Sequence, residues 1–140
     1  MKEDLLNIGC TPRKTETLNF PKNIPNTLII HFIRGYFDGD GCLSFVTRKG
    51  IRHLMSSFIG TKNILLGIQR VLGLSQKLHK ASHVKNSSDF VFEFKIAKKD
   101  SVKILNILYN DSSIYLERKY KRFSIFKENN YAVPTEKSLE

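Results

Sequence analysis

Residues 25–41, PNTLIIHFIRGYFDGDG, carry a clear repeat of apolar positions. Apolar side chains recur at the i, i+3, i+4, i+7 spacing of one helix face, at Ile29, Phe32, Ile33 and Tyr36. Asn26 or Thr27 can cap the start of such a helix. Glycines at 39 and 41 prevent it from continuing much further. The pattern therefore predicts a helix that ends in the acidic segment DGDG, residues 38–41.

Two pairs of segments have the composition of β-hairpins. CLSFVTR (42–48) and RHLMSSFIG (52–60) are separated by KGI, a hairpin-sized gap that contains a glycine. SQKLHKAS (75–82) and FVFEFKIA (90–97) form the second pair, joined by the polar link HVKNSSD (83–89). In the last segment the inward set would be Phe90, Phe92, Phe94 and Ile96, and the outward set Val91, Glu93 and Lys95.

Three further segments have helical patterns. TKNILLGIQRVLGL (61–74) is amphipathic, with Thr61 as its cap and Gly73 as its stop. KKDSVKILNILYN (98–110) can be capped by Asp100 or Ser101, and SIYLERKYKRFSIFKEN (113–129) follows. The order is helix, hairpin, helix, hairpin, helix, helix. It predicts an α+β fold in which helices cover one face of a four-stranded, mainly antiparallel sheet and leave the other face free.

The length of 140 residues suits one domain. Residues 1–25 contain prolines at 12, 21 and 25 and are expected to be an N-terminal extension or linker. The domain itself is expected at 26–128, followed by a flexible tail at 129–140. The two cysteines lack CxxC spacing, no apolar run is long enough for a membrane span, and the start does not resemble a signal peptide. We therefore expect a cytoplasmic protein with free thiols.

The net charge of +10 indicates a polyanionic partner, most often nucleic acid. Most of the excess positive charge lies in residues 74–127, where aromatic residues stand among lysines and arginines. Charge alone leaves open a basic protein whose lysines are simply solvated, or an interaction module that docks an acidic protein.

The segment DGDG has three interpretations. It can be a plain turn, since Asp and Gly are favoured there. It does not fit a calcium-binding EF-hand loop, because starting at Asp38 puts Leu43 where glycine is needed, and starting at Tyr36 puts Thr47 where glutamate is needed. It can also be a metal site at an interface. Two acids at the negative end of a helix repel each other unless a cation such as Mg²⁺ neutralises them.

Gly35 and Gly39 support the third interpretation, because they lie four residues apart on one helix face. Glycine costs about 1 kcal/mol in a helix interior relative to alanine, so two of them suggest the close approach of another backbone. Two such helices, packed glycine to glycine, would bring two acidic ends together. Two acids, divalent ions and a phosphodiester form the arrangement of a metal-assisted nuclease.

FIRGYFDGDG (32–41) closely resembles the LAGLIDADG motif of homing endonucleases, with DGDG in place of DADG. The resemblance covers roughly residues 26–127 and extends to the predicted order of elements. It implies the αββαββα fold, double-stranded DNA as substrate, and pairing of motif helices in a homodimer or with a second half-enzyme. The resemblance implies a pairing face formed by Ile33, Gly35, Tyr36, Asp38 and Gly39. Arg34 stands where the motif has a small residue, so its side chain must leave the helix contact.

The resemblance also implies the catalytic groups. Asp40 matches the metal-binding acid, with Gly39 beside it, and Asp38 more plausibly supports the helix end. Lys119 best fits the basic residue near the cleavage centre, although Arg118 and Lys121 are close to it. Thr61, Lys62 and Asn63 are candidates for positioning water. The DNA-contacting set expected on the free sheet face and nearby is Ser44, Val46, Arg48, Lys77, His79, Lys95, Arg118 and Lys121.

The sequence therefore predicts a Mg²⁺-dependent, site-specific endonuclease of double-stranded DNA, of the kind carried by phages or mobile elements. The alternative is a protein of the same fold that binds DNA without cutting it, such as a regulator or an intron splicing cofactor.

Overall fold

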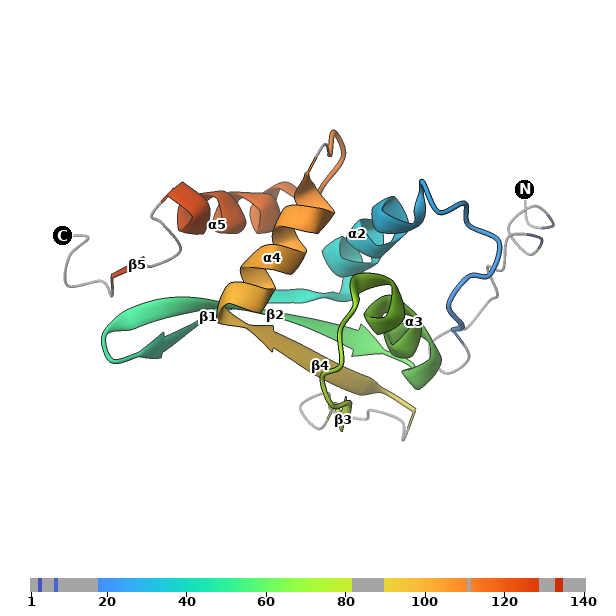
Figure 1. Cartoon of the computed structure of the whole chain (residues 1–140), viewed down its shortest axis with the longest axis horizontal. Coiled ribbons are helices and arrows are strands. Elements are labelled where there is room, and N and C mark those ends of the chain that lie inside the picture. Colours follow the sequence, from blue (N-terminus) through green and yellow to red (C-terminus); the bar gives the residue numbers. More distant parts are fainter. Residues whose placement is uncertain are drawn as a thin grey trace. The chain divides into compact units, whose positions relative to one another are not determined.

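The computed structural model describes residues 3, 7, 18–81, 90–110, 112–128 and 133–134. Its elements, in chain order, are α2 (Ile29–Asp40), β1 (Cys42–Arg48), β2 (Ile51–Gly60), α3 (Lys62–Leu72), β3 (His79–Lys80), β4 (Phe92–Ala97), α4 (Lys98–Tyr109), α5 (Glu117–Glu128) and β5 (Val133–Pro134) (Figure 1). This order confirms the predicted α+β fold. No helix in the described ranges is long and apolar enough to cross a membrane.

The strands form one mainly antiparallel sheet in the order β1-β2-β4-β3, and β5 pairs with the start of β2. The register of β1 and β2 runs from Cys42 opposite Ser57 to Arg48 opposite Ile51. The turn between them contains only Lys49 and Gly50, whose φ angles of 51° and 76° are both left-handed. This is the pattern of a two-residue type I′ turn. Ile51, which the sequence pattern places in the turn, is therefore the first residue of β2.

The second hairpin is much shorter than its sequence pattern predicts. Of residues 75–82, only His79 and Lys80 form a strand, opposite Glu93 and Phe92. The Gln69 side chain donates a hydrogen bond of 2.7 Å to the carbonyl of Gln76, which ties this segment to α3 before β3 begins. Phe90 precedes β4 and is exposed, so its predicted inward position is wrong. The predicted link 83–89 lies outside the described residues.

The chain divides into two compact units, and β2 and β4 each run from one unit into the other. The first unit comprises Met1–Ile29 and Phe58–Phe94. The ends of its helix α3 are the predicted ones: Thr61 accepts from the backbone N–H of Ile64, and Gly73 adopts a left-handed C-cap conformation.

Residues before α2 pack onto α3 in this first unit. The backbone N–H of Phe20 donates to Asn63 Oδ1 at 2.9 Å, and Thr61 Oγ1 donates to the carbonyl of Leu18. The Phe20 side chain lies directly over Gly67, where a Cβ atom would come within 2.5 Å of the Phe20 Cβ. The end of the expected linker, residues 18–20, therefore forms specific contacts with a helix.

The second unit comprises Ile30–Ser57 and Lys95–Glu140. Helices α4 and α5 lie on the same side of the β1–β2 hairpin (Figure 1). Phe126 of α5 packs against Phe45 of β1, with ring centroids 5.9 Å apart, and Ser101 of α4 shares a 2.8 Å hydrogen bond with Ser56 of β2. Helix α4 starts at Lys98, so the predicted caps Asp100 and Ser101 lie inside it, and Ser101 is fully buried.

Candidate active site

Asp40 is the last residue of α2 and is exposed. The backbone N–H of Gly41 donates to the carbonyl of Phe37 at 2.9 Å and closes the final helical turn. Burial raises the pKa of Tyr36, and the negative charge of Asp40 one turn later contributes, bringing it to about 12. The acid is thus held at the negative end of a helix, where a cation would be stabilised.

Lys119 closes this helix end from α5. Its ammonium donates to the carbonyls of Phe37 at 2.5 Å, Asp38 at 2.9 Å and Gly41. These three bonds use all three N–H donors of the lysine, whose side chain is buried. The ammonium also lies 4.9 Å from the centroid of the Phe37 ring. Lys119 therefore caps the C-terminus of α2 and fixes the backbone on both sides of Asp40.

Burial lowers the pKa of the Lys119 ammonium. The positive charge of Arg118 acts in the same direction, whereas Asp38 acts most strongly against it. Lys119, the predicted basic residue, thus lies near Asp40. Its N–H groups, however, donate to carbonyl oxygens of α2 and of the residue that follows the helix.

Asp38 joins three elements through its two carboxylate oxygens. Tyr109, at the end of α4, donates its hydroxyl to Oδ1 at 2.6 Å. The backbone N–H of Leu116, directly before α5, donates to Oδ2 at 2.8 Å. A carboxylate is favourable at this helix start. Both oxygens are thus engaged within the chain, and the side chain supports the helix end as the sequence suggests.

Burial raises the pKa of Tyr109 strongly, and its hydrogen bond to the Asp38 carboxylate raises it further. Above about pH 10 an unfolded tyrosine loses its proton while the folded one keeps it, so the native state binds more protons. The free energy of unfolding should then fall by about 1.4 kcal/mol per pH unit for this group.

We expect Tyr109→Phe to make the chain less stable near neutral pH and less sensitive to alkali. Loss of a hydrogen bond to a charged group should lower the free energy of unfolding by about 1.5–3 kcal/mol. Between about pH 10 and about pH 11 the decline should be shallower by about 1.4 kcal/mol per unit. Urea titrations across this pH range measure both the loss of stability and the slope. Lys119 also titrates in this range, but its effect on stability cancels in the comparison because the wild type and Tyr109→Phe both contain it. Parallel stability curves would contradict the assignment.

Arg34 is buried and bridges α2 to the connection between α4 and α5. Its Nε donates to the carbonyl of Ile114 at 3.0 Å, and one terminal nitrogen donates to the carbonyl of Leu108 at 3.1 Å. The other lies 2.7 Å from Nδ1 of His31. The side chain thus leaves the exposed helix face by turning inward. Local patterning misses this role, because the acceptors are carbonyls more than seventy residues away.

The predicted pairing face is only partly available on α2. Gly35 and Gly39 are exposed, and apart from the adjacent residues and the nearby backbone of α2, no atom of the described residues lies within 4 Å of a Cβ added at either. Tyr36 is half-buried. Ile33 is fully buried in the core of its own unit, so its side chain is not exposed on α2 in the single chain. The buried residues of the helix are Ile33, Arg34 and Phe37. The inward face of α2 therefore differs from the predicted apolar face, which contains Phe32 and Tyr36.

Ser44 and Val46 of β1 are half-buried, Arg48 is exposed, and Lys95 of β4 is exposed. Lys77 precedes β3, and His79 lies opposite Glu93. On α5, Arg118 and Lys121 are exposed, and Lys121 pairs with Glu117 at 2.9 Å. Of the water-positioning candidates, Thr61 and Asn63 are engaged in holding residues 18–20 against α3, and Lys62 is exposed.

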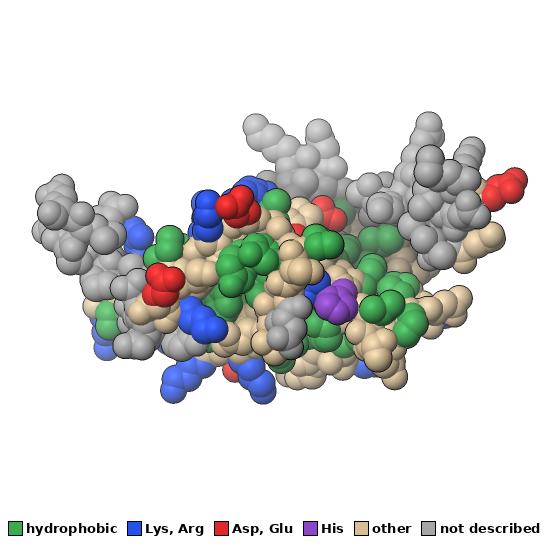
Figure 2. All heavy atoms as spheres, turned by 90° about the horizontal axis from the view of Figure 1, so that it is seen from above, with side chains coloured by type: hydrophobic (Ala, Val, Ile, Leu, Met, Phe, Trp, Pro, Cys, Tyr) green, Lys and Arg blue, Asp and Glu red, His purple; other side chains and the backbone are tan. Residues whose placement is uncertain are grey.

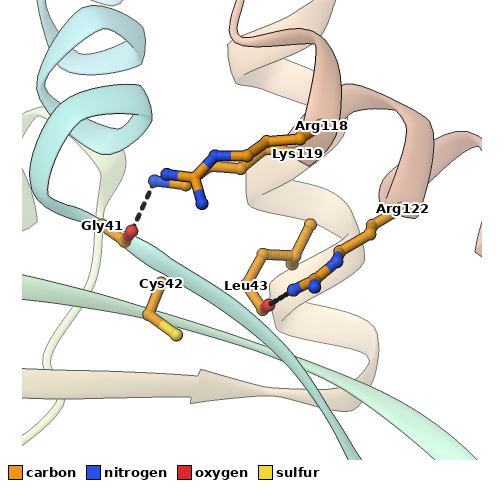
Figure 3. Close-up of a pocket in the computed structure, with 6 residues that line it drawn as sticks. All are labelled: Gly41, Cys42, Leu43, Arg118, Lys119 and Arg122. Atoms are coloured by element: carbon orange, nitrogen blue, oxygen red, sulfur yellow. Dashed lines mark hydrogen bonds between the residues drawn. The ribbon is translucent and has the colours of Figure 1, made fainter.

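A small cavity opens directly after Asp40, between the start of β1 and α5 (Figure 3). Its volume is about 110 Å³, and it is lined by Gly41, Cys42, Leu43, Arg118, Lys119 and Arg122. Arg122 donates to the carbonyl of Leu43 at 3.2 Å. Arg122 is absent from the predicted site, although its position one helical turn after Arg118 is a signal that sequence reasoning could have used.

No group of three or more His, Cys, Asp or Glu side chains that could hold a metal ion occurs in the described ranges. Asp40 is a hard oxygen donor of the kind that Mg²⁺ or Ca²⁺ prefers, and backbone carbonyls are also suitable ligands. The donor set of one chain therefore fits a cation only if water, phosphate oxygen or a second unit completes it.

Three solved structures of homing endonucleases resemble this chain. I-CvuI, solved in complex with its target in the presence of 2 mM Ca, matches with a TM-score of 0.51 and 22% identity, over 74% of this chain and 68% of that one. The LAGLIDADG meganuclease I-AabMI, bound to uncleaved DNA, matches with a TM-score of 0.51 and 18% identity, over 73% of this chain and 38% of that one. I-TnaI matches with a TM-score of 0.50 and 15% identity, over 78% and 77%.

The chain therefore has the fold of the LAGLIDADG homing endonucleases, as its motif predicts. It spans well under half the length of I-AabMI. No protein-family profile and no curated protein sequence matches it.

Proposed function

We propose that this protein is a site-specific endonuclease of double-stranded DNA that requires a divalent cation. The observation that carries the proposal is Asp40, an exposed acid at the end of the motif helix, with Lys119 fixing the backbone around it. Of the proteins with this fold, I-CvuI was solved in complex with its target and I-AabMI bound to uncleaved DNA. The basic charge of +10 supports the same partner.

In this proposal Asp40 provides the carboxylate ligand, and the backbone carbonyl of Gly39, the preceding residue, is a second candidate ligand. A divalent cation there would lower the pKa of a bound water and stabilise charge on the phosphate, the chemistry of metal-assisted hydrolysis. Mg²⁺ suits the site because it retains several waters and binds through one or two carboxylates together with phosphate oxygens. The Ca present with I-CvuI is consistent with a divalent ion.

Lys119 acts as a positioning residue in this proposal, because its donors hold carbonyls and not a substrate oxygen. Asp38 has a supporting role for the same reason, since Tyr109 and Leu116 occupy its oxygens. The chemistry therefore depends on Asp40, and its neighbours keep that acid at a fixed position.

Outward side chains of the sheet are proposed to contact the duplex. Alternate residues of a strand can reach base edges in the major groove, and peripheral cations can hold phosphates. Ser44, Val46, Arg48 and Lys95 are the candidates in the second unit, and Lys77 and His79 in the first. Lys121 is a weaker candidate because Glu117 partly neutralises it.

One Asp40 per chain is enough to cut one strand, so cutting both requires a second unit. We propose that the exposed face of α2 with Gly35 and Gly39 packs against that unit, in a homodimer or a two-part enzyme. The surface nearby is apolar: seen from the side of α5 and the α4–α5 connection, hydrophobic side chains gather there (Figure 2). Ile114, whose carbonyl is bound by Arg34, is 81% exposed.

We expect Gly35→Leu to disrupt pairing without unfolding the chain. Apart from the adjacent residues and the nearby backbone of α2, no atom of the described residues lies within 4 Å of the added Cβ, and leucine favours a helix over glycine by about 1 kcal/mol, so the fold itself should be stable. Light scattering should show a dimer for the wild type and a monomer for the variant. The control for adding an exposed leucine is Lys103→Leu, because Lys103 is exposed on α4 and its replacement leaves α2 unchanged. Gly50→Leu is not suitable, because Gly50 has a φ angle of 76° that leucine rarely adopts. A dimeric mass for both wild type and Gly35→Leu would contradict this interface, whereas a monomeric wild type would indicate the two-part enzyme.

The function is tested by incubating the wild type with a randomised duplex library and sequencing the ends produced. With Mg²⁺ we expect cuts at one defined sequence, and with EDTA we expect none while binding persists. Binding that is never followed by cutting, with any of Mg²⁺, Mn²⁺ or Ca²⁺, would instead support a DNA-binding protein of this fold. The absence of duplex binding would exclude both functions.

A further inference from the structure

We propose that the cavity beside Asp40 binds one backbone phosphate of the duplex, through Arg118 and Arg122, and so fixes the register of the DNA relative to the acid. This inference rests on the proposed function and assigns to that site a contact that neither the motif nor the fold specifies. It places Arg122 among the DNA-binding residues for the first time.

The charge around the cavity selects an anion. Arg118 and Arg122 are four residues apart on α5, so they face the same side of the helix and repel each other. Lys119 adds a third positive charge, and none of the residues that line the cavity is acidic. Figure 3 shows both arginine side chains extending from α5 toward the start of β1. An anion between the guanidinium groups would relieve this repulsion.

The hydrogen-bond donors left over belong to the two arginines. All three N–H groups of Lys119 are taken by carbonyls, so it contributes charge but no donor. Arg122 uses one terminal nitrogen for the carbonyl of Leu43, and most of its five N–H groups have no acceptor among the described residues. Arg118 is exposed and makes no hydrogen bond or ion pair with the described part of the chain. Guanidinium groups bind phosphate through two parallel hydrogen bonds.

The size and place of the cavity favour a phosphate of the DNA backbone. The volume of about 110 Å³ leaves room for one phosphate group. Gly41 and Cys42, which line the cavity, follow Asp40 directly in the chain. A phosphate held here would therefore lie close to the one that reacts at Asp40, on the same stretch of duplex.

Figure 3 shows the Cys42 thiol directed away from Arg118 and Arg122, so occupancy of the cavity is measured through stability. Inorganic phosphate would be added to the wild type and to Arg118→Gln, and thermal unfolding followed. A ligand that binds only the folded protein raises its melting temperature. Phosphate should therefore raise the melting temperature of the wild type and have little effect on that of Arg118→Gln.

The salt dependence of duplex binding gives a second, independent measurement. Loss of one phosphate contact should reduce the slope of log K against log salt by about 0.9 for Arg118→Gln. Lys103→Gln, which removes an exposed positive charge from α4, should leave the slope nearly unchanged. Thermal unfolding checks that each variant is folded. Arg118 has no partner to lose in the described part of the chain, so its variant should melt like the wild type.

The outcomes separate the two proposals. A rise in melting temperature with phosphate that Arg118→Gln removes, together with the smaller slope, supports a phosphate pocket. If the wild type binds the duplex but phosphate stabilises the wild type and Arg118→Gln equally, or if Arg118→Gln and Lys103→Gln have the same slope, the pocket assignment is overturned while the nuclease proposal stands. If the wild type does not bind duplex at all, the proposed function fails, and stabilisation by inorganic phosphate alone would assign the pocket to a free anion.

Discussion

Replacing Asp40 by asparagine should abolish cleavage while leaving the protein folded and able to bind its duplex. Asparagine keeps the size of the side chain but removes the charge that holds a cation. Metal ions contribute several kcal/mol to hydrolysis, so the rate should fall by about a thousandfold or more, equivalent to about 4 kcal/mol. Asp40 is exposed and ends its helix, so the free energy of unfolding should change little.

The matched control for Asp40→Asn is Asp100→Asn, the same chemical change at an exposed position in the first turn of α4. Both variants would be assayed with Mg²⁺ on the duplex selected from the library, and binding would be measured in EDTA. Cleavage by Asp40→Asn at the wild-type rate would exclude this acid as the metal ligand. Equal losses in both variants would indicate a nonspecific effect of charge.

Lys119→Met should have the largest effect on stability. Methionine preserves much of the side-chain length but cannot donate to the carbonyls of Phe37, Asp38 and Gly41. Buried acceptors that lose their partner cost about 1–3 kcal/mol each, and water can satisfy some of them, so we expect a loss of about 3 kcal/mol in the free energy of unfolding. Urea unfolding monitored by circular dichroism measures it.

Lys121→Met is the control for this change, because Lys121 lies on the same helix but is exposed, and among the described residues its ion-pair partner is Glu117. Exposed pairs of this kind contribute little, so its unfolding curve should resemble that of the wild type. At temperatures where Lys119→Met remains folded, its cleavage rate should still be reduced, since the backbone around Asp40 is no longer fixed. Full stability in Lys119→Met would contradict the capping role, and full activity would contradict the positioning role.

Local patterning predicts the elements whose limits are set by neighbouring residues. Thr61 and Gly73 bound α3 because capping depends on side-chain and backbone chemistry within a few residues. The first hairpin is likewise determined by two adjacent residues, Lys49 and Gly50, that can adopt left-handed angles. The predicted third strand is shortened to His79 and Lys80, and the residues before it are tied to α3, where Gln69 donates to the Gln76 carbonyl.

In the candidate site too, features set by neighbouring residues are predicted from the sequence and those set by distant residues are not. Asp40 and its place at a helix end follow from glycines and acids within ten residues. The partners that hold this end do not, because Tyr109, Leu116 and Lys119 lie more than seventy positions further along the chain. Arg34 could not be placed for the same reason: its acceptors are backbone carbonyls, which carry no sequence signature.

The hydrogen bonds from Lys119 to the end of α2 have a consequence for the order in which the site forms during synthesis. The helix itself can form once residue 40 has left the ribosome, because its hydrogen bonds are local. Its carboxyl end cannot be secured until Lys119 has emerged, 82 residues after Phe37. Contacts of such separation form late, after the entropy of closing a long loop has been overcome. A nascent chain therefore carries the acid long before it can hold that acid in place, and the site that we propose for cleavage would be assembled only when residues up to Lys119 have been made.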